Sequence, residues 1–501
     1  MGINSSIRQR VIPPDAKNVY FVGIKGTGVC ALAELMHNAG LKISGSDTHE
    51  VFYTDAILKE LKIPFHEDFN ASHINKEIDV IIHSAAYSAG SNPELARAQA
   101  LDIPVIKYTD ALGEWSRKFN SAGICGVHGK TNTTAISGVL ARSAKLPAQI
   151  LTGSAVLDFG GRSTLSLGDK YFIAETCEYQ KNFLSFCPKR IVLTSIESDH
   201  HDFFPDYASI RDAFVEYCRL LPQGGQLIYC ADDPGASEAA HIIKTETDSS
   251  TAGIKLIPYG FTASGNYKID SYKVENKMVV FTLAGIPADF RIPVPGRHEA
   301  LNAAAAIALT ISLVKEEFNA EDGSILIKEK IDSMKGALET FKSSKRRSEI
   351  IGEACGILFM DDYGHHPTAI ITTLAGIKSF YPKRRLIVSF MPHTYTRTSA
   401  LIDQFAGAFN DADILFLHKI YASARENYSG VIDGNVLYEK TAALRKGETF
   451  YFHEPDDAFE TLCGTLKSTD IFITLGAGNN WPVAEKLYAY FKSLEGGGKT
   501  S

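Results

Sequence analysis

The stretch Gly126–Thr131, with the sequence G-V-H-G-K-T, decides the fold of this chain. It follows the apolar segment 122–125 and precedes residues 133–144, whose composition favours a helix. A strand, a glycine turn and a Lys-Thr pair at the start of a helix are typical of a phosphate-binding loop. The glycines let backbone N–H groups approach the phosphate oxygens, and the helix N-terminus favours anions. The lysine adds positive charge, and the threonine hydroxyl can ligate Mg²⁺.

The glycine spacing departs from the strict Walker pattern. That pattern requires a glycine five residues before Gly129, and Ile124 occupies this position. The loop therefore has the shorter form G-x-x-G-K-T, and a glycine turn without a ligand is the alternative interpretation. We expect nucleotide contacts from the loop and the first helical turn, from Gly126, His128, Gly129, Lys130, Thr131, Asn132 and Thr133.

The bulk composition excludes several classes of protein. With 501 residues the chain is too long for one core, so about two to four domains are expected. A formal net charge of −7 argues against binding to nucleic acid or to a membrane surface. No apolar run approaches the roughly 20 residues of a membrane helix, and the start of the chain lacks a signal-peptide core. Eight cysteines without a C-x-x-C pair indicate reduced thiols and a cytoplasmic protein.

Short apolar strands alternate with helical patterns along the chain, which predicts βαβ units and parallel sheets. The first unit has strands expected at 18–22, 42–44, 80–83 and 105–106. The second begins with the phosphate loop, continues with strands at 171–174, 191–195 and 226–230, and closes with a helix at 299–314. The third has strands expected at 357–360, 386–390, 414–417 and 471–475. We therefore predict an α/β fold with three domains, at 1–118, 119–336 and 337–501.

A second glycine turn, Gly23–Gly28, follows the first expected strand and opens a helix. Asp47 lies about 20 residues further on, where dinucleotide-binding folds place the acid that holds a ribose. The G-x-G-x-x-G fingerprint, however, requires glycine where Lys25 stands. The remaining turn can hold a diphosphate at a helix N-terminus. An NAD(H)-dependent oxidoreductase and a plain tight turn stay open as alternatives.

Polar side chains follow two strands of the second unit. Glu175 ends one strand, and the segment 198–202, S-D-H-H-D, with His200 at its centre, follows another. Parallel strands open on the same sheet edge as the phosphate loop, so this carboxylate and imidazole can complete the coordination of Mg²⁺ around a nucleotide. A solvated polar turn is the alternative for each segment.

The segment 295–302, P-G-R-H-E-A-L-N, starts an alanine-rich helix. His298 and Asn302 are four residues apart and therefore share one helix face. From that face both side chains can form hydrogen bonds to the edge of a base. A capping or surface histidine is the alternative for His298.

Polar clusters also follow the strands of the third unit: D-D-Y-G-H-H-P at 361–367, P-H-T-Y-T-R-T at 392–398, I-Y-A-S-A-R-E at 420–426 and G-A-G-N at 476–479. All four fall at strand carboxyl ends, which form the functional edge of an open α/β sheet. A zinc site built from histidines is possible, but no cysteine or glutamate spacing supports it.

These motifs, in this order, resemble those of the Mur ligases, the ATP-dependent amino-acid-adding enzymes of peptidoglycan synthesis. The short phosphate loop, the strand-end glutamate, the D-H-x-D turn and P-G-x-H-x-x-x-N form that family's signature, and they cover nearly the whole chain. The resemblance implies a Rossmann-like N-terminal domain for a UDP-sugar, a central P-loop-type ATPase domain, and a Rossmann-like C-terminal domain that brings the amino acid. It implies ATP and Mg²⁺ as cofactors and UDP-N-acetylmuramate and L-alanine as substrates of a monomer or homodimer.

The resemblance also implies roles for individual residues. Lys130 contacts the β- and γ-phosphates, and the metal ligands are Thr131, Glu175 and His200. Adenine is held by His298 and Asn302, and the ribose by Asp362. The residues expected to contact the UDP-sugar are Gly26, Thr27, Gly28, Ser46, Asp47 and Ser84. Those expected near the acceptor and the incoming amine are Tyr363, His365, His393, Arg397 and Arg425.

The reaction implied is amide formation through an acyl phosphate, with His365 or His393 as proton acceptor. Several positions depart from the family pattern: Lys25, Asn132, Ser195, Glu299, Thr394 and Asn479. Thr394 stands where an arginine is usual, and this removes a charge near the acceptor carboxylate. A ligase that adds a recycled tripeptide to the same nucleotide sugar is the main alternative within the family. A folylpolyglutamate synthetase and a non-catalytic nucleotide sensor are others.

Overall fold

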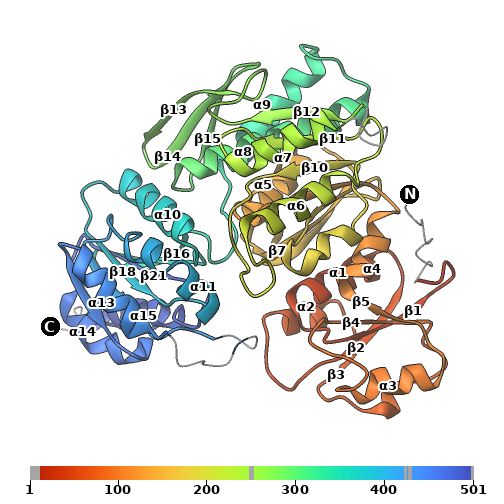
Figure 1. The fold of residues 1–501 in the computed structure, drawn as a ribbon, viewed down its shortest axis with the longest axis horizontal. Helices are drawn as coiled ribbons and strands as arrows, with labels where there is room; N and C mark the ends of the chain where they lie inside the picture. The colour runs from red at the N-terminus through yellow and green to blue at the C-terminus, as the bar shows by residue number, and fades with distance from the viewer. Residues whose placement is uncertain (1–11, 247–252, 423–425, 427–431, 498–501) are drawn as a thin grey trace. The chain divides into compact units, whose positions relative to one another are not determined.

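The computed structural model describes residues 12–246, 253–422, 426 and 432–497. Within them the chain forms three mainly parallel sheets and one small antiparallel sheet, with helices between the strands (Figure 1). The predicted α/β class is confirmed. None of the helices in the described residues is long and apolar enough to cross a membrane.

The chain divides into two compact units. The first extends to Ile196 and includes Arg211–Tyr259 and Ala305–Met334. The second comprises Glu197–Ile210, Gly260–Ala304 and the residues from Lys335 onward. Three helices, α6, α8 and α9, have residues in both units.

The N-terminal sheet of the first unit has the strand order β3-β2-β1-β4-β5, and all its pairings are parallel. Its central strand has the apolar sequence N-V-Y-F-V and is buried on both faces, as parallel strands between helices are. The strands are β1 (Asn18–Val22), β2 (Lys42–Ser46), β3 (Phe65–His66), β4 (Val80–His83) and β5 (Val105–Lys107). The helices are α1 (Thr27–Asn38), α2 (Thr54–Glu60), η1 (Ala71–His73), α3 (Pro93–Ala100) and α4 (Tyr108–Ser116).

A seven-stranded sheet follows, with the order β12-β11-β10-β6-β9-β7-β8, in which only the pairing of β7 with β8 is antiparallel. Every residue of α5 from Thr131 to Ala141 is buried, so the sheet and its neighbours hold this helix firmly. The strands are β6 (Asn120–Cys125), β7 (Ala148–Val156), β8 (Arg162–Ser166), β9 (Tyr171–Glu175), β10 (Arg190–Leu193), β11 (Gln226–Cys230) and β12 (Lys255–Tyr259). The helices are α5 (Lys130–Ser143), η2 (Leu157–Phe159), η3 (Tyr179–Ser185), α6 (Tyr207–Cys218), α7 (Pro234–Thr245), α8 (Arg297–Phe318) and α9 (Ile325–Glu339).

A small antiparallel sheet belongs to the second unit, and no motif in the sequence pointed to it. It consists of β13 (Ile269–Glu275), β14 (Met278–Leu283) and β15 (Ile286–Ile292). Asn276 and Lys277 connect the first two strands with φ angles of 52° and 58°. Two consecutive positive φ angles are typical of the tight turns that match the twist of a hairpin.

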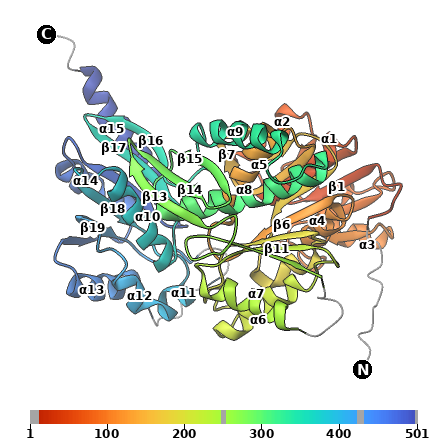
Figure 2. The same cartoon turned by 90° about the horizontal axis from the view of Figure 1, so that it is seen from above.

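The C-terminal sheet has the order β16-β17-β21-β18-β19-β20, and only the edge pairing of β16 with β17 is antiparallel. Helices α10, α12 and α13 pack on one face and α14 and α15 on the other, which gives three layers (Figure 2). The strands are β16 (Glu349–Ala354), β17 (Ile357–Asp362), β18 (Leu386–Phe390), β19 (Ile414–Leu417), β20 (Glu448–Tyr451) and β21 (Ile471–Leu475). The helices are α10 (Pro367–Phe380), α11 (Tyr395–Ala400), α12 (Ile402–Ala406), α13 (Gly434–Leu444), η5 (Pro455–Ala458), α14 (Phe459–Thr465) and α15 (Pro482–Gly497).

Candidate active site

The phosphate loop lies between β6 and α5, where the sequence predicted it. Gly126 has φ +135°, and a side chain at this position would clash with Thr194. Gly129 has φ +78° and is the N-cap of α5, so the helix begins at Lys130. Both glycines therefore occupy backbone conformations that other residues rarely adopt, and the loop cannot be rebuilt with larger residues.

The residues that follow β10, the neighbour of β6 in the sheet, hold the phosphate loop from the side. The Ser195 hydroxyl accepts a hydrogen bond from the His128 backbone N–H at 2.9 Å. The Thr194 hydroxyl donates to the His128 and Cys125 carbonyl oxygens. Ser195 is one of the departures from the family pattern, and in this chain its short side chain fixes the loop backbone.

Lys130 forms a buried ion pair that the sequence did not predict. Its Nζ lies 2.9 Å from Glu178 Oε2, and it also donates to the Gly126 carbonyl oxygen. Burial lowers the pKa of the Lys130 ammonium, but the charge of Glu178, helped by Cys177 and Glu175, outweighs burial and holds the pKa above its ordinary value. The lysine is therefore charged and directed at its own loop. The only sequence signal for Glu178 is its place just beyond the strand-end Glu175.

Hard oxygen ligands gather at this sheet edge. Glu175 ends β9, which is paired in parallel with β6, and Ile124 lies opposite Glu175 in that pairing. Glu175 Oε2 accepts a hydrogen bond from the Gly153 N–H at 2.7 Å. The Thr131 hydroxyl is buried in the first turn of α5, and Asn132 and Thr133 follow it. One hydroxyl and two carboxylates, those of Glu175 and Glu178, form a donor set that suits Mg²⁺.

The N-terminal glycine turn follows β1. Gly26 is the N-cap of α1, and Thr27 and Gly28 are its first residues. Asp47 Oδ2 accepts a hydrogen bond from the Lys25 N–H at 2.7 Å, so this carboxylate stabilises the turn. Ser46 ends β2, and Ser84 follows β4, so the residues expected to contact the UDP-sugar surround the carboxyl ends of neighbouring strands.

Lys25, the departure within this turn, is not directed at the turn. Its side chain is fully buried, and its Nζ lies 3.0 Å from Glu67 Oε1 and 3.4 Å from Asp55 Oδ2. It also donates to the Glu50 carbonyl oxygen at 2.9 Å. The ammonium therefore ties the turn to α2 and β3, and its charge is matched by carboxylates.

In the second unit, His298 and Asn302 lie in the first turns of α8 and Asp362 ends β17. Burial lowers the pKa of His298, but Glu299 at 3.3 Å and the charge of Asp362 raise it above its ordinary value. Asp362 uses one oxygen to accept from the Ser348 N–H and the other from the Gly364 N–H, both at 2.7 Å. His298 and Asp362 are thus close enough to interact electrostatically, which fits a shared ligand.

Arg397 is the centre of the third cluster. Its Nε and Nη2 both lie 2.8 Å from Asp199 Oδ1, and both side chains are buried. Burial raises the pKa of the Asp199 carboxyl, but Arg397, His200 and His365 lower it far more. Arg397 Nη1 lies 3.1 Å from His393 Nδ1. A cavity adjoins this pair and is lined by His200, His201, Asp202, His393, Thr394, Thr396, Arg397 and Glu426.

His365 has the protonation state that a base requires. Its Nδ1 lies 2.9 Å from the Tyr363 carbonyl oxygen, so Nδ1 carries the proton and Nε2 the lone pair. Burial, reinforced by the charge of Arg397, holds the pKa of His365 well below its ordinary value. Its ring centroid lies 5.7 Å from that of His393 and 5.2 Å from that of Tyr363. Tyr363, His365, His393 and Arg397 are therefore brought together, whereas Arg425 lies outside the described residues.

Three family models match the chain. The model of the Mur ligase family, catalytic domain, matches residues 18–120, that of the Mur ligase middle domain matches 124–310, and that of the Mur ligase, glutamate ligase domain, matches 346–478.

Curated proteins of similar sequence have similar length. The UDP-N-acetylmuramate–L-alanine ligase of Treponema pallidum is 44% identical over 488 residues, which cover 97% of this chain and 99% of the relative. The protein of the same name from Borreliella burgdorferi is 36% identical over 471 residues, 93% of this chain and 97% of the relative.

Two solved structures share the fold. The UDP-N-acetylmuramate-alanine ligase from Thermotoga maritima has a TM-score of 0.73 at 21% identity and covers 95% of this chain and 99% of its own. The murein peptide ligase from Psychrobacter arcticus has a TM-score of 0.64, also at 21% identity and with the same coverage. Together with the three family models, these likenesses confirm the predicted class of three α/β domains.

Proposed function

The chain belongs to the Mur ligase family, and from that premise we propose that it joins L-alanine to the lactyl carboxylate of UDP-N-acetylmuramate at the expense of ATP. The observation that carries this proposal is the 44% identity, over 97% of the chain, to a ligase of that name. The tripeptide-adding alternative has less support, because the murein peptide ligase is only 21% identical to this chain and so supports a shared fold alone.

The phosphate loop supplies the electrostatics of the first step. The lactyl carboxylate attacks the γ-phosphorus of ATP, and the bond from this phosphorus to the oxygen that bridges the β- and γ-phosphates breaks. The products of this step are ADP and an acyl phosphate. The ammonium of Lys130 already lies at the loop, where it contacts backbone carbonyl oxygens. From there it can stabilise the negative charge of the γ-phosphate as that group is transferred. Glu178 holds the lysine in place until the nucleotide arrives.

Mg²⁺ is proposed for the same edge of the sheet. Thr131, Glu175 and Glu178 would hold it. His200, a further ligand implied by the family resemblance, belongs to the second unit. When bound, Mg²⁺ would neutralise charge on the phosphates.

The amine step belongs to the third cluster. L-Alanine must arrive as a neutral amine to attack the acyl carbon, and phosphate then leaves from a tetrahedral intermediate. We propose that His365 Nε2 accepts the proton, because this ring is neutral and has its lone pair available. Arg397 and His393 would position the acceptor carboxyl group, with Tyr363 and Arg425 nearby.

The proposed contacts with the UDP-sugar and with the adenosine part of ATP involve two further groups of residues. The UDP diphosphate would lie against Gly26, Thr27 and Gly28, with Ser46, Asp47 and Ser84 around the nucleotide sugar. Adenine and ribose would contact His298, Asn302 and Asp362. We propose domain boundaries at 1–118, 119–336 and 337–501, a cytoplasmic location, and a monomer or homodimer that binds neither nucleic acid nor membrane.

Phosphate release tests the proposal directly. The protein would be mixed with ATP, Mg²⁺ and UDP-N-acetylmuramate, and with L-Ala, L-Ser, Gly or the L-Ala-γ-D-Glu-diamino-acid tripeptide in turn. We expect release that depends on one free amino acid and is fastest with L-Ala. Release with the tripeptide alone would assign the recycling reaction instead, and no release with any acceptor would contradict the ligase.

A further inference from the structure

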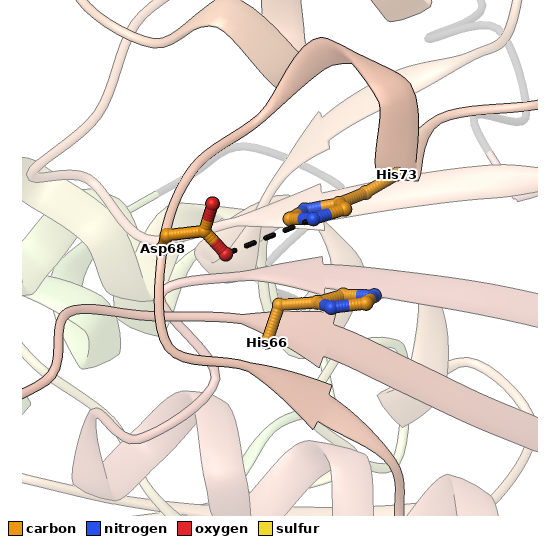
Figure 3. Close-up of side chains that lie close together, drawn as sticks. All are labelled: His66, Asp68 and His73. Atoms are coloured by element: carbon orange, nitrogen blue, oxygen red, sulfur yellow. Dashed lines mark ion pairs between the residues drawn. The ribbon is translucent and has the colours of Figure 1, made fainter.

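Two histidines and an aspartate gather in the N-terminal sheet region, outside the residues assigned to the reaction. His66 ends β3, Asp68 follows it, and His73 lies in η1 (Figure 3). The imidazole rings of His66 and His73 are stacked, with centroids 3.6 Å apart and planes inclined by 6°. One ligand atom from each of the three side chains lies within 4.8 Å of the others.

A buried carboxylate fixes the orientation of His73. Its Nδ1 lies 2.8 Å from Glu94 Oε1, and the Glu94 side chain is fully buried. Glu94 also accepts hydrogen bonds from the Tyr20 and Ser46 hydroxyl groups. Because an ionised carboxylate only accepts, the proton lies on His73 Nδ1, and in the neutral ring the lone pair lies on Nε2. Metal-binding histidines are commonly held in this way by a second carboxylate.

The His73 lone pair points toward a negative group. Nε2 lies 3.7 Å from Asp68 Oδ1, which is longer than a hydrogen bond. A metal ion about 2.1 Å from each atom would subtend an angle of about 120° across this separation, which is near the tetrahedral value. The distance therefore suits a bridging ion better than a direct hydrogen bond.

The surrounding charge also favours a cation. Asp68 and Glu94 lie beside the His73 ring, Glu67 lies between His66 and Asp68 in the chain, and the ammonium of Lys25 is already paired with Glu67 and Asp55. His66 is exposed at the end of an edge strand. Parallel rings cannot both direct a nitrogen at one ion, so His66 must turn about its side-chain bonds, which its exposure allows.

We propose that His66, Asp68 and His73 form a binding site for a divalent transition-metal ion of the Zn²⁺ type. The ion would have two imidazole ligands, one carboxylate ligand and one water molecule, with Glu94 as a positioning residue. Imidazole nitrogens select such ions over Mg²⁺ and Ca²⁺, which prefer oxygen ligands. The bound ion would join β3 to η1 and, through Glu94, to Ser46 at the end of β2.

Cobalt(II) and zinc(II) titrations of the chelator-treated, full-length protein test the site. Tetrahedral Co²⁺ absorbs strongly in the visible range, octahedral Co²⁺ at oxygen ligands absorbs weakly, and thiolate ligands add an ultraviolet charge-transfer band. We expect one tetrahedral Co²⁺ per chain without that band, and displacement of Co²⁺ by one equivalent of Zn²⁺. The affinity should fall at least tenfold in His66→Ala and be unchanged in His241→Ala, an exposed histidine of α7 that serves as the matched control.

A variant of Glu94 tests its proposed role as a positioning residue. Glu94→Gln should keep one Co²⁺ per chain but weaken its binding by about tenfold, as changes to such supporting carboxylates do. Equal affinity in the wild type and His66→Ala, a thiolate band, or no tetrahedral Co²⁺ at neutral pH would each overturn the proposal. The last result, together with a doubly protonated His73 in a histidine NMR spectrum, would show that an imidazolium bridges Glu94 and Asp68 instead. Because His66 is exposed, its variant is expected to fold, and these results do not depend on the ligase assay.

Discussion

Lys130 is the residue on which the proposed phosphoryl transfer most depends. Lys130→Ala should lower kcat at least about a hundredfold, because it removes the positive charge that would stabilise the phosphate in the transition state. The protein should still fold, since α5 is buried from Thr131 to Ala141, but its melting temperature should fall, because the buried Glu178 carboxylate loses its partner. Steady-state phosphate release and a thermal melt would measure the two effects.

Lys145→Ala is the matched control, because this lysine is exposed just after the same helix. It should leave turnover and stability unchanged. Wild-type kcat in Lys130→Ala would contradict the assignment of the phosphate loop.

Lys25 makes a prediction about stability. Lys25→Met removes the charge that neutralises the buried Asp55 carboxylate, so the free energy of unfolding should fall by about 3 kcal/mol. The double variant Lys25→Met/Asp55→Leu removes both charges and should recover most of this loss. Urea denaturation followed by circular dichroism would compare the three proteins. A single variant as stable as the wild type would show that the ion pair is dispensable.

At the scale of the elements, His418 joins three strands of the C-terminal sheet. It follows β19, its Nε2 lies 2.8 Å from the Ser389 hydroxyl of β18, and its Nδ1 lies 3.0 Å from the Phe452 carbonyl oxygen beyond β20. Burial lowers the pKa of His418 to about 4. The folded state therefore holds this ring neutral, whereas the unfolded chain protonates it near pH 6.5.

The sign of the pH dependence follows from this difference. The contribution of His418 is fully present above pH 6.5 and is lost as the pH falls from there toward 4, because the unfolded state binds the proton first. Between pH 8 and pH 5.5 the loss should be about 1 kcal/mol. His418→Gln should show a smaller loss when urea midpoints are compared at the two pH values. An equal loss in both proteins would assign the pH dependence to other groups.

The elements that the sequence predicted well are those with strong local signals. The strands at 18–22 and 226–230 have the predicted bounds, and the loop before α5 lies where its glycines placed it. The antiparallel strands β13–β15 were not predicted, because burial does not alternate regularly along β13 and β14 and their local signal is therefore weak. The edge strands β8, β16 and β20 are short or partly exposed, so their apolar pattern is weak.

The candidate site was predictable in its residue types but not in its pairings. Strand-end positions indicated Glu175, His365 and Arg397, because parallel strands bring their carboxyl ends to one edge. The ion pairs of Lys130 with Glu178 and of Arg397 with Asp199 join residues far apart in sequence, and a single sequence has no signal for such contacts. The ligand contacts proposed for these residues remain predictions.

At the scale of the whole molecule, the reactivity of the cysteine thiols indicates whether the protein is folded. All eight are free thiols: Cys30, Cys125, Cys218 and Cys230 are buried, and Cys177, Cys187, Cys355 and Cys463 are more accessible. Burial raises the pKa of Cys30, Cys218 and Cys230 to about 12, so few thiolates exist at neutral pH.

A thiol reagent at pH 8 should therefore modify at most four cysteines rapidly in the native protein and all eight in denaturant. The count would be measured by absorbance with an aromatic disulfide. Rapid modification of more than four thiols in the folded chain would mean that one of the cores opens easily.

The ion pair between Lys130 and Glu178 also has a consequence for chemical labelling. An amine reacts with acylating reagents only when it has lost its proton, and the raised pKa of Lys130 makes that form rarer than in an ordinary lysine. Covalent probes directed at lysines will therefore label surface amines and spare the one in the phosphate loop. Inhibitors of this chain are therefore better designed as anions that compete with Glu178 for the ammonium of Lys130. Electrophiles that react with a neutral amine are the poorer choice.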